Sequence, residues 1–404
     1  GDTSWDRKGL KKRMEEDGYF QISPQELRLK ADCGVLAESV LELERLGWPA
    51  TFLIMFDEAW AVAEQVEKVV EATTGGCRNN LDMLAWNIDP NKDQAGFSPH
   101  RDRQPDDVAG SFRPDGTPKY ATAWVPFTDA CPDNSCLYVI PRWSDPGYTA
   151  GDGEKDVLRE ALPTKEAYQS IRALPTPAGG ACVFSHRTIH WGSRGRRGYP
   201  TPRIALSIAC ADDAFEPPYF SREFLPLPSL RLRLALAASQ ILCYHERFCP
   251  SVRELALYKR VYEAGKGMLS PEYRTKVRRE FIAAVKDNHE RGASDSGSEG
   301  SAVLDDALDA MLDAQADGEE LEDDWGEVDE EQWGGVPIYA PLKTQDTPSS
   351  EHGVKKVSQK KKREVGGEEG LKKKKKKKQK KKRHTQQTNK HTHSLSHTHT
   401  NTHT

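Results

Sequence analysis

Hydrophobic and polar positions follow a helical pattern in the first part of the chain. A charged stretch at 8–20 is expected to form a helix that stops at Gly18. Over about 35–46 and 57–72, apolar residues recur every three to four positions, which is the period of a helix with one buried face. The pattern therefore predicts three helices before residue 73.

From residue 82 onward the apolar residues gather into short runs of strand length. These runs cover 83–88, 121–127, 136–140, 181–184 and 204–209. Pro, Gly, Asn, Asp and Ser fill the breaks, for example at 132–135 and 177–180. Successive short strands without regular helices between them favour a sandwich or barrel over a parallel α/β sheet. Helical periodicity then returns over 228–290.

The C-terminal part of the chain has a different composition. Residues 293–335 hold many Asp and Glu but no Lys or Arg, and residues 336–404 contain an unbroken lysine run and alternating His and Thr. Such compositions are typical of disordered chain. We therefore expect a folded domain with a helical C-terminal extension at 1–292, an acidic disordered segment at 293–335 and a low-complexity tail at 336–404. The formal net charge of -4 sums opposite blocks and says little about the folded part.

The eight cysteines are scattered and no pair forms a C-x-x-C motif. This spacing predicts free thiols and an intracellular, reducing compartment. The cytoplasm is favoured, with an organelle or the nucleus left open. No run approaches the roughly 18 apolar residues of a membrane span, so no membrane partner is expected.

One His-x-Asp triplet, His100-Arg101-Asp102, follows the first strand-like run. Two residues apart on an extended segment, an imidazole and a carboxylate point to the same side and can grip one metal ion. The third ligand must come from a distant strand, where His186 and His190 compete. We favour His190, which precedes a Gly-Ser turn at the expected strand end. Two His and one carboxylate on one face of an iron leave three positions for a chelating cosubstrate and dioxygen.

Arg203 stands at the start of an apolar strand. An arginine that faces inward there needs a carboxylate partner, and the 5-carboxylate of 2-oxoglutarate would satisfy it through a bidentate fork. His-Arg-Asp also opens the catalytic loop of protein kinases. That reading is rejected, because no Asn stands five residues after Asp102 and no glycine-rich loop precedes it.

Six segments in this order make the chain resemble the phytanoyl-CoA dioxygenase family over roughly residues 10–215. They are Glu-Asp-Gly-Tyr-Phe at 16–20, Pro-His-Arg-Asp at 99–102, Ala-Trp-Val-Pro-Phe-Thr-Asp-Ala at 123–130, Asn-Ser-Cys-Leu-Tyr-Val-Ile-Pro at 134–141, Val-Phe-Ser-His-Arg-Thr-Ile-His at 183–190 and Pro-Arg-Ile-Ala-Leu-Ser at 202–207.

The resemblance implies a mainly β fold, a double-stranded β-helix (jelly roll, cupin-like) with flanking helices. It implies His190 as the distal iron ligand and Arg203 as the residue that grips 2-oxoglutarate, with Ser193 and Trp124 lining the cosubstrate pocket. Relatives usually read His-Gly-Ser, whereas here Trp191 precedes Gly192, which leaves the role of Ser193 open. The implied cofactors are Fe(II), 2-oxoglutarate as cosubstrate and dioxygen, with ascorbate as an optional accessory.

The function implied is that of a dioxygenase that hydroxylates a small organic substrate and releases succinate and CO2. Because Asp102 is present, hydroxylation is favoured over halogenation, in which related enzymes replace this ligand by a small residue. Two alternatives stay open: a non-catalytic jelly-roll module whose charged tails recruit partners, and an oxygenase acting on a protein or nucleic-acid residue. A nucleic-acid partner is not expected, and the substrate and oligomeric state are left open.

Overall fold

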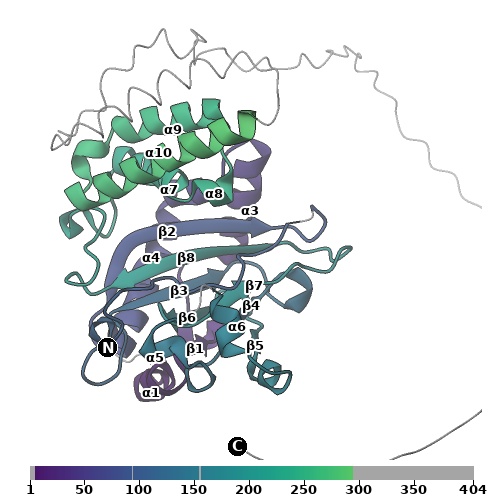
Figure 1. The fold of residues 1–404 in the computed structure, drawn as a ribbon. Coiled ribbons are helices and arrows are strands. Elements are labelled where there is room, and N and C mark those ends of the chain that lie inside the picture. Colours follow the sequence, from purple (N-terminus) through teal and green to yellow (C-terminus); the bar gives the residue numbers. More distant parts are fainter. Residues whose placement is uncertain (1–4, 93, 154–155, 294–404) are drawn as a thin grey trace, which may run out of the picture. The chain divides into compact units, whose positions relative to one another are not determined.

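Two antiparallel sheets with helices around them make up the described part of the chain, residues 5–92, 94–153 and 156–293 of a computed structural model (Figure 1). All of these residues belong to one unit, 1–337. The strands are β1 (Tyr19–Ile22), β2 (Arg78–Ile88), β3 (Tyr120–Pro126), β4 (Leu137–Val139), β5 (Arg172–Leu174), β6 (Ala181–Ser185), β7 (His190–Gly192) and β8 (Arg203–Ala211). The helices are α1 (Arg7–Asp17), α2 (Pro24–Leu27), α3 (Cys33–Arg45), α4 (Asp57–Thr74), α5 (Gly147–Ala150), α6 (Val157–Ala161), α7 (Leu230–Cys243), α8 (His245–Phe248), α9 (Val252–Glu263) and α10 (Pro271–Ala293).

The chain alternates between the two sheets. The larger sheet has the order β1-β6-β3-β8-β2 and the smaller one β5-β4-β7, so β3 and β4, β5 and β6, and β7 and β8 lie in different sheets. Isolated bridges join Ala95 to Arg194 and His100 to His190, which lays the segment before β3 beside β7. This alternation is that of a double-stranded β-helix, and the predicted fold class is confirmed.

The strands of the larger sheet present alternate residues to two different surroundings. Ala121, Ala123 and Val125 of β3 belong to the main hydrophobic core, and α4 packs against β2, β3 and β8. The intervening residues Tyr120 and Thr122 face the space between the sheets. This two-residue period, with a helix on one face and a cavity on the other, explains why nearly every residue of these strands is buried.

The N-terminal helices follow the predicted pattern closely. Gly18 ends α1 with a positive φ of 81°, a conformation that glycine adopts without strain. In α4, Val62, Val66 and Val70 are buried at helical spacing, and Gly75 ends this helix in the same left-handed conformation. The predicted stop of the first helix at Gly18 is confirmed, and Tyr19 directly after it begins strand β1, which pairs with β6.

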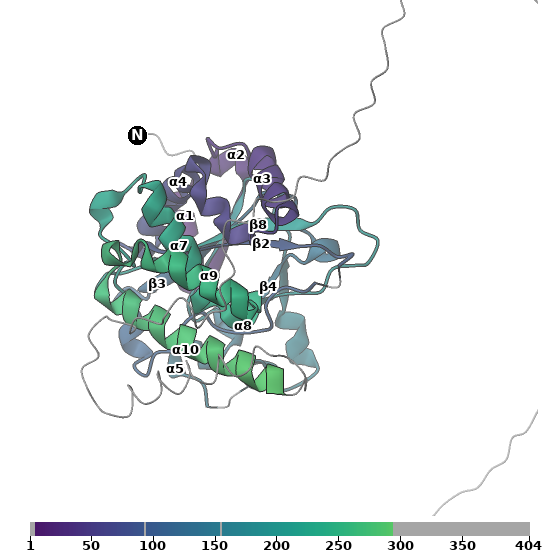
Figure 2. The same ribbon diagram turned by 90° about the horizontal axis from the view of Figure 1, so that it is seen from above.

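The C-terminal helices gather beside the β2 edge of the larger sheet (Figures 1 and 2). Helix α7 contacts β2, α9 and α10, and it is buried on almost every side. Helix α9 begins with a capping box in which Ser251 and Glu254 satisfy each other's backbone N–H groups. The helical extension predicted at 228–290 is therefore present and packs on the domain.

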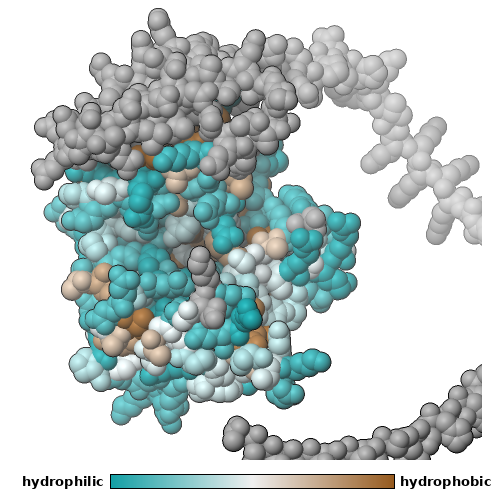
Figure 3. Space-filling model, in the orientation of Figure 1, coloured by the Kyte–Doolittle hydropathy of each residue, from teal (hydrophilic) through white to brown (hydrophobic). Residues whose placement is uncertain are grey.

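On the face drawn in Figure 3, the coloured residues are mostly hydrophilic, and apolar residues form small patches. None of the described helices is long and apolar enough to span a membrane. All eight cysteines are free, and Cys249 is exposed whereas Cys77, Cys136, Cys182 and Cys210 are buried. The expectations for residues 294–404 lie outside the described residues.

Candidate metal centre

A cavity of about 110 Å³ lies between the two sheets. It is built from alternate residues of three neighbouring strands: Asp82, Leu84 and Trp86 of β2, Tyr120, Thr122 and Trp124 of β3, and Arg203, Ser207 and Ala209 of β8. The smaller sheet contributes Leu137 and residues 190–192 from the other side. The two-residue period of the strands therefore turns three separate stretches of sequence into one cavity wall.

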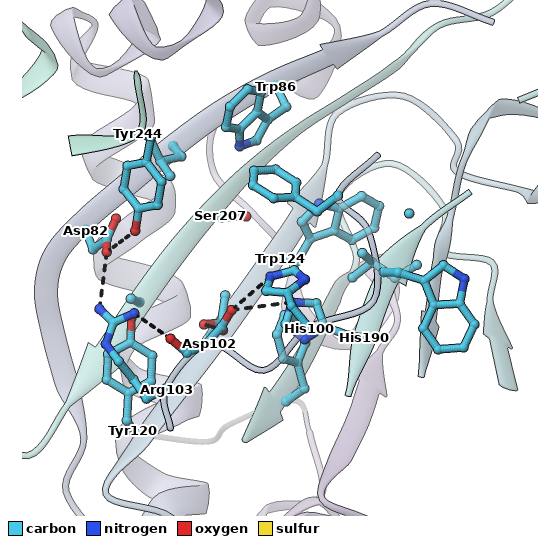
Figure 4. Close-up of a pocket in the computed structure, with 18 of the residues that line it drawn as sticks. Asp82, Trp86, His100, Asp102, Arg103, Tyr120, Trp124, His190, Ser207 and Tyr244 are labelled. Carbon is cyan, nitrogen blue, oxygen red and sulfur yellow. Dashed lines mark hydrogen bonds and ion pairs between the residues drawn. The ribbon is translucent and has the colours of Figure 1, made fainter. Parts of the chain in front are cut away.

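His100, Asp102 and His190 meet in this cavity, with ligand atoms all within 4.8 Å of one another (Figure 4). The Nε2 atoms of His100 and His190 lie 3.6 and 3.4 Å from Asp102 Oδ1. Backbone hydrogen bonds in both directions tie His100 to His190, at 3.1 and 3.0 Å. The bridge between the segment before β3 and β7 therefore sets the distance between the two imidazoles.

The imidazole tautomers are fixed by backbone carbonyls. His100 Nδ1 lies 2.7 Å from the Ser98 carbonyl, and His190 Nδ1 lies 3.0 Å from the Thr188 carbonyl. A carbonyl only accepts, so each Nδ1 carries a proton, and Nε2 keeps a lone pair when the ring is neutral. Burial lowers the pKa of His100, but the neighbouring Asp102 carboxylate outweighs it and raises this pKa overall. Burial lowers the pKa of His190 to about 4, which keeps this ring neutral at ordinary pH. Both rings therefore present a metal-binding nitrogen to the centre.

Thr122 holds the second oxygen of the Asp102 carboxylate. Its hydroxyl donates to Asp102 Oδ2 at 2.5 Å, while Oδ1 faces the two histidines. Burial alone would raise the pKa of Asp102, but the two imidazoles and this hydrogen bond lower it overall. The carboxylate is thus kept ionised and turned so that one oxygen is available at the centre.

Buried ion pairs support the segment that carries the two ligands. The Arg101 guanidinium pairs with Asp145 at 2.6 Å and with Asp152 at 2.7 Å. Arg187 shares Asp152 at 2.9 Å and donates to the Gly147 carbonyl. Since the side chains of Arg101, Asp145 and Arg187 are each 1% exposed, these pairs lie in the interior next to the ligands.

His186, the competing candidate for the third ligand, stands outside the cluster. Its Nδ1 lies 3.0 Å from the Tyr120 carbonyl and its Nε2 lies 2.9 Å from Ser111 Oγ. Both ring nitrogens therefore have partners in the protein, and burial lowers the pKa of this imidazole to about 4. Its surroundings are those of a packing histidine, whereas the Nε2 of His190 faces Asp102 in the cluster.

Arg203 lies in the same cavity and is 3% exposed. Its Nε donates to the Ser135 carbonyl at 3.1 Å, and its guanidinium lies 5.5 Å from the centre of the Trp124 ring. Within the described part of the chain it forms no ion pair with a carboxylate, and burial lowers its pKa to about 10. Arg203 therefore remains a cation at neutral pH, and no carboxylate of the described residues neutralises its charge.

The predicted pocket residue Ser193 does not line the cavity, unlike Trp124. Along β7 the residue two after His190 is Gly192, which therefore shares its side of the strand. A Cβ at Gly192 would lie 3.1 Å from Ser135 Oγ and 3.3 Å from Arg203 Nη2. The extra residue Trp191 has thus moved the serine one position along and off the inner side.

Ser135 provides a hydroxyl in this place, which the sequence reasoning missed. It is fully buried, and its Oγ has no hydrogen-bond partner in the described structure. Its φ of 74° is strained for a residue with a side chain. This hydroxyl lies near the Arg203 guanidinium, and the pair Asn-Ser at 134–135 indicated only a turn in the sequence.

A double-stranded β-helix in which two histidines and a carboxylate converge is the arrangement of non-haem iron oxygenases. The family comparison agrees, because residues 52–198 match the model of the phytanoyl-CoA dioxygenase family, PhyH. This match confirms the family resemblance, and it contains His100, Asp102 and His190 but ends before Arg203. A comparison with curated proteins found no match.

Several solved structures resemble about half of the chain. The epimerase SnoN from nogalamycin biosynthesis is 17% identical and covers 51% of this chain and 80% of its own, with a TM-score of 0.35. AviO1 from Streptomyces viridochromogenes Tue57 is 17% identical over 52% of this chain and 96% of its own, with a TM-score of 0.38. EctD from S. alaskensis, solved with 2-oxoglutarate and 5-hydroxyectoine, is 14% identical over 57% and 83%, with a TM-score of 0.37.

Proposed function

We propose that the protein is an Fe(II)- and 2-oxoglutarate-dependent oxygenase that hydroxylates a small organic substrate, with release of succinate and CO2. The observation that carries this proposal is Arg203. A buried cation without a carboxylate, in the same cavity as two histidines and an aspartate, calls for an anionic ligand that also reaches the metal. A 2-oxo dicarboxylate meets both requirements, because one end can chelate a metal while the other pairs with a guanidinium.

The residues present fit both groups. Two imidazole nitrogens and one carboxylate oxygen are the donor set that non-haem Fe(II) uses. On the other side of the cavity, Arg203 offers donors to a carboxylate, and the Ser135 hydroxyl, which has no protein partner, lies behind Gly192 near this guanidinium. Bound iron and cosubstrate would supply oxygen activation, which no amino-acid side chain provides.

The chain's own residues orient the metal ligands and place apolar side chains beside Arg203. Thr122 and the carbonyls of Ser98 and Thr188 fix the orientation of the three ligands before any metal binds. Trp124 and Leu137 are buried and line the cavity together with Arg203, so apolar surface borders the guanidinium. Low dielectric there strengthens the pairing with a carboxylate.

Release of succinate from 2-oxoglutarate tests the proposal. The full chain should release succinate with added Fe(II) and stop when the metal is chelated. His190→Gln should abolish this release, whereas His186→Gln, a matched change of a buried histidine outside the cluster, should retain it. If well-folded protein releases no succinate with iron present, the alternative of a non-catalytic jelly-roll module takes the place of this proposal.

A further inference from the structure

The cavity has a second polar end, on the far side of Asp102 from His190. Figure 4 shows Asp82, Arg103, Tyr120 and Tyr244 gathered there, away from Trp124. All four line the cavity. They come from β2, from the loop after Asp102, from β3 and from the end of α7, so four elements converge on this place.

Asp82 reaches the cavity through an irregularity in β2. The pairing with β8 shifts between Asn79 and Met83, and Leu81 has a φ of 77°. The side chains of Asn79 and Asn80 accept from the backbone N–H groups of Leu81 and Asp82, which holds this bulge in place. Bulges recur next to active sites because they change the direction of a side chain. A positive φ is unfavourable for leucine, and such strained residues cluster at functional sites.

The charges at this end are already balanced within the protein. Asp82 Oδ2 accepts from Tyr219 and Tyr244 at 3.0 and 2.7 Å and lies 3.5 Å from Arg103 Nη2. Arg103 also forms a fork with Glu216, at 2.6 and 2.7 Å. Lys276 adds a second cation by donating to the Tyr219 hydroxyl at 2.8 Å. Two carboxylates and two cations leave no net charge for a ligand to neutralise.

Three hydrogen-bonding groups of this end lack a partner. Asp82 Oδ1 and the hydroxyls of Tyr120 and Ser207 form no hydrogen bond within the described part of the chain, and all three residues line the cavity. Polar atoms that border a cavity without a protein partner are available to a ligand that can supply one.

Apolar rings lie next to these groups. Trp86 and Phe97 line the cavity and meet edge to face at 4.9 Å, and Phe97 packs on His100 with ring centres 5.6 Å apart. A molecule that reaches from Asp82 toward the metal ligands therefore passes along aromatic surface. A ligand that makes polar contacts at one end and aromatic contacts along its body would be a ring or chain that carries hydroxyl groups.

We infer that this end of the cavity binds an uncharged, hydroxyl-bearing part of the substrate, with one hydroxyl donating to Asp82 and another group accepting from Tyr120. Calling that ligand the substrate rests on the proposed function. The binding site itself does not, because it is formed by residues other than the three metal ligands. A cationic or anionic group would place an unbalanced charge in a buried site whose own charges cancel.

Matched probes test this inference on the full chain carrying Arg203→Ala, so that a carboxylate cannot bind at the other end of the cavity, with metal removed by EDTA. The probes are trans-1,2-cyclohexanediol, cyclohexylamine and cyclohexanecarboxylate, which share one ring and differ in the polar group. Dissociation constants are read from ligand saturation-transfer NMR titrations. We expect the diol to bind at least about tenfold more tightly than either charged probe. Tighter binding of the amine or the carboxylate, or no binding of the diol, would overturn the inference.

Variants locate the binding. Asp82→Asn should weaken diol binding about tenfold and Tyr120→Phe about threefold, because they remove a charged and a neutral hydrogen-bond partner. Tyr168→Phe, at an exposed tyrosine that does not line the cavity, is the matched control. Unchanged diol binding in Tyr120→Phe and in Ser207→Ala would contradict the assignment even if Asp82→Asn fails to fold. Since iron and 2-oxoglutarate are absent from this measurement, its failure is distinguishable from failure of the succinate test.

Discussion

Replacing Asp152 by Asn is expected to destabilise the protein strongly, because this carboxylate is shared by two buried arginines. Asp152 Oδ1 accepts from Arg101 at 2.7 Å and Asp152 Oδ2 from Arg187 at 2.9 Å. With Asp152 neutralised, only Asp145 would remain opposite two guanidinium groups, and one positive charge would be left unpaired in the interior. Burial and the charge of Arg101 already lower the pKa of Arg187, and Asp152 counteracts this shift, so its loss would further disfavour the charged guanidinium.

The expected cost is about 3–5 kcal/mol of unfolding free energy, the range for removing one partner of a buried ion pair. Urea unfolding followed by tryptophan fluorescence measures it. Asp213→Asn is the matched control, since Asp213 pairs with Arg222 but is 50% exposed, and its loss should stay below about 1 kcal/mol. Equal and small losses in the two variants would show that the buried pairs do not hold the ligand segment.

Three further outcomes are expected. Thr122→Val should weaken Fe(II) binding roughly 10- to 100-fold in a competition titration with a chelator, because Asp102 loses its orienting partner; unchanged affinity would refute this role. Arg203→Ala should raise the 2-oxoglutarate concentration needed for half-maximal succinate release by at least tenfold, with Arg222→Ala as control. Because burial lowers the pKa of His186 from 6.5 to about 4, acidification between these pH values protonates it only in the unfolded chain and should cost about 3 kcal/mol. That contribution is fully retained above pH 6.5, and His186→Gln should lack it in urea titrations across this range.

Local patterns predicted the parts of the site that depend on local geometry. The spacing of His100 and Asp102 placed both on one side of an extended segment, and the structure brings them together. The choice between His186 and His190 needed more than the chain's own pattern, because the two stand four residues apart and strand parity does not separate them. The Gly-Ser turn after His190 and the family resemblance favoured His190, and the structure distinguishes the pair by the partners of their ring nitrogens.

Ser193 was predicted to line the cosubstrate pocket because relatives carry a serine shortly after the distal histidine ligand. The two-residue alternation of β7 instead places Gly192 on the cavity side of the strand, together with His190. The hydroxyl at that place comes from Ser135, more than fifty residues earlier, and only the packing of the turn after Cys131 against β7 shows it. The polar end at Asp82 was likewise hidden, because Glu216, Tyr244 and Lys276 belong to three separate elements whose convergence no local pattern reports. Strand β1 escaped prediction because four residues beside a helix end carry too little periodicity.

Anaerobic binding of Fe(II) and 2-oxoglutarate to the full chain tests the central claim most directly, through the weak visible charge-transfer band of the chelate. Asp102→Ala is the decisive comparison, since it keeps the histidines at 391–404 and differs only in the cavity. We predict a band in the native chain that Asp102→Ala loses and Arg203→Ala shows only at higher 2-oxoglutarate. A well-folded native chain without the band, or an equal band in Asp102→Ala, would contradict the assignment of this cavity as an iron and 2-oxoglutarate site.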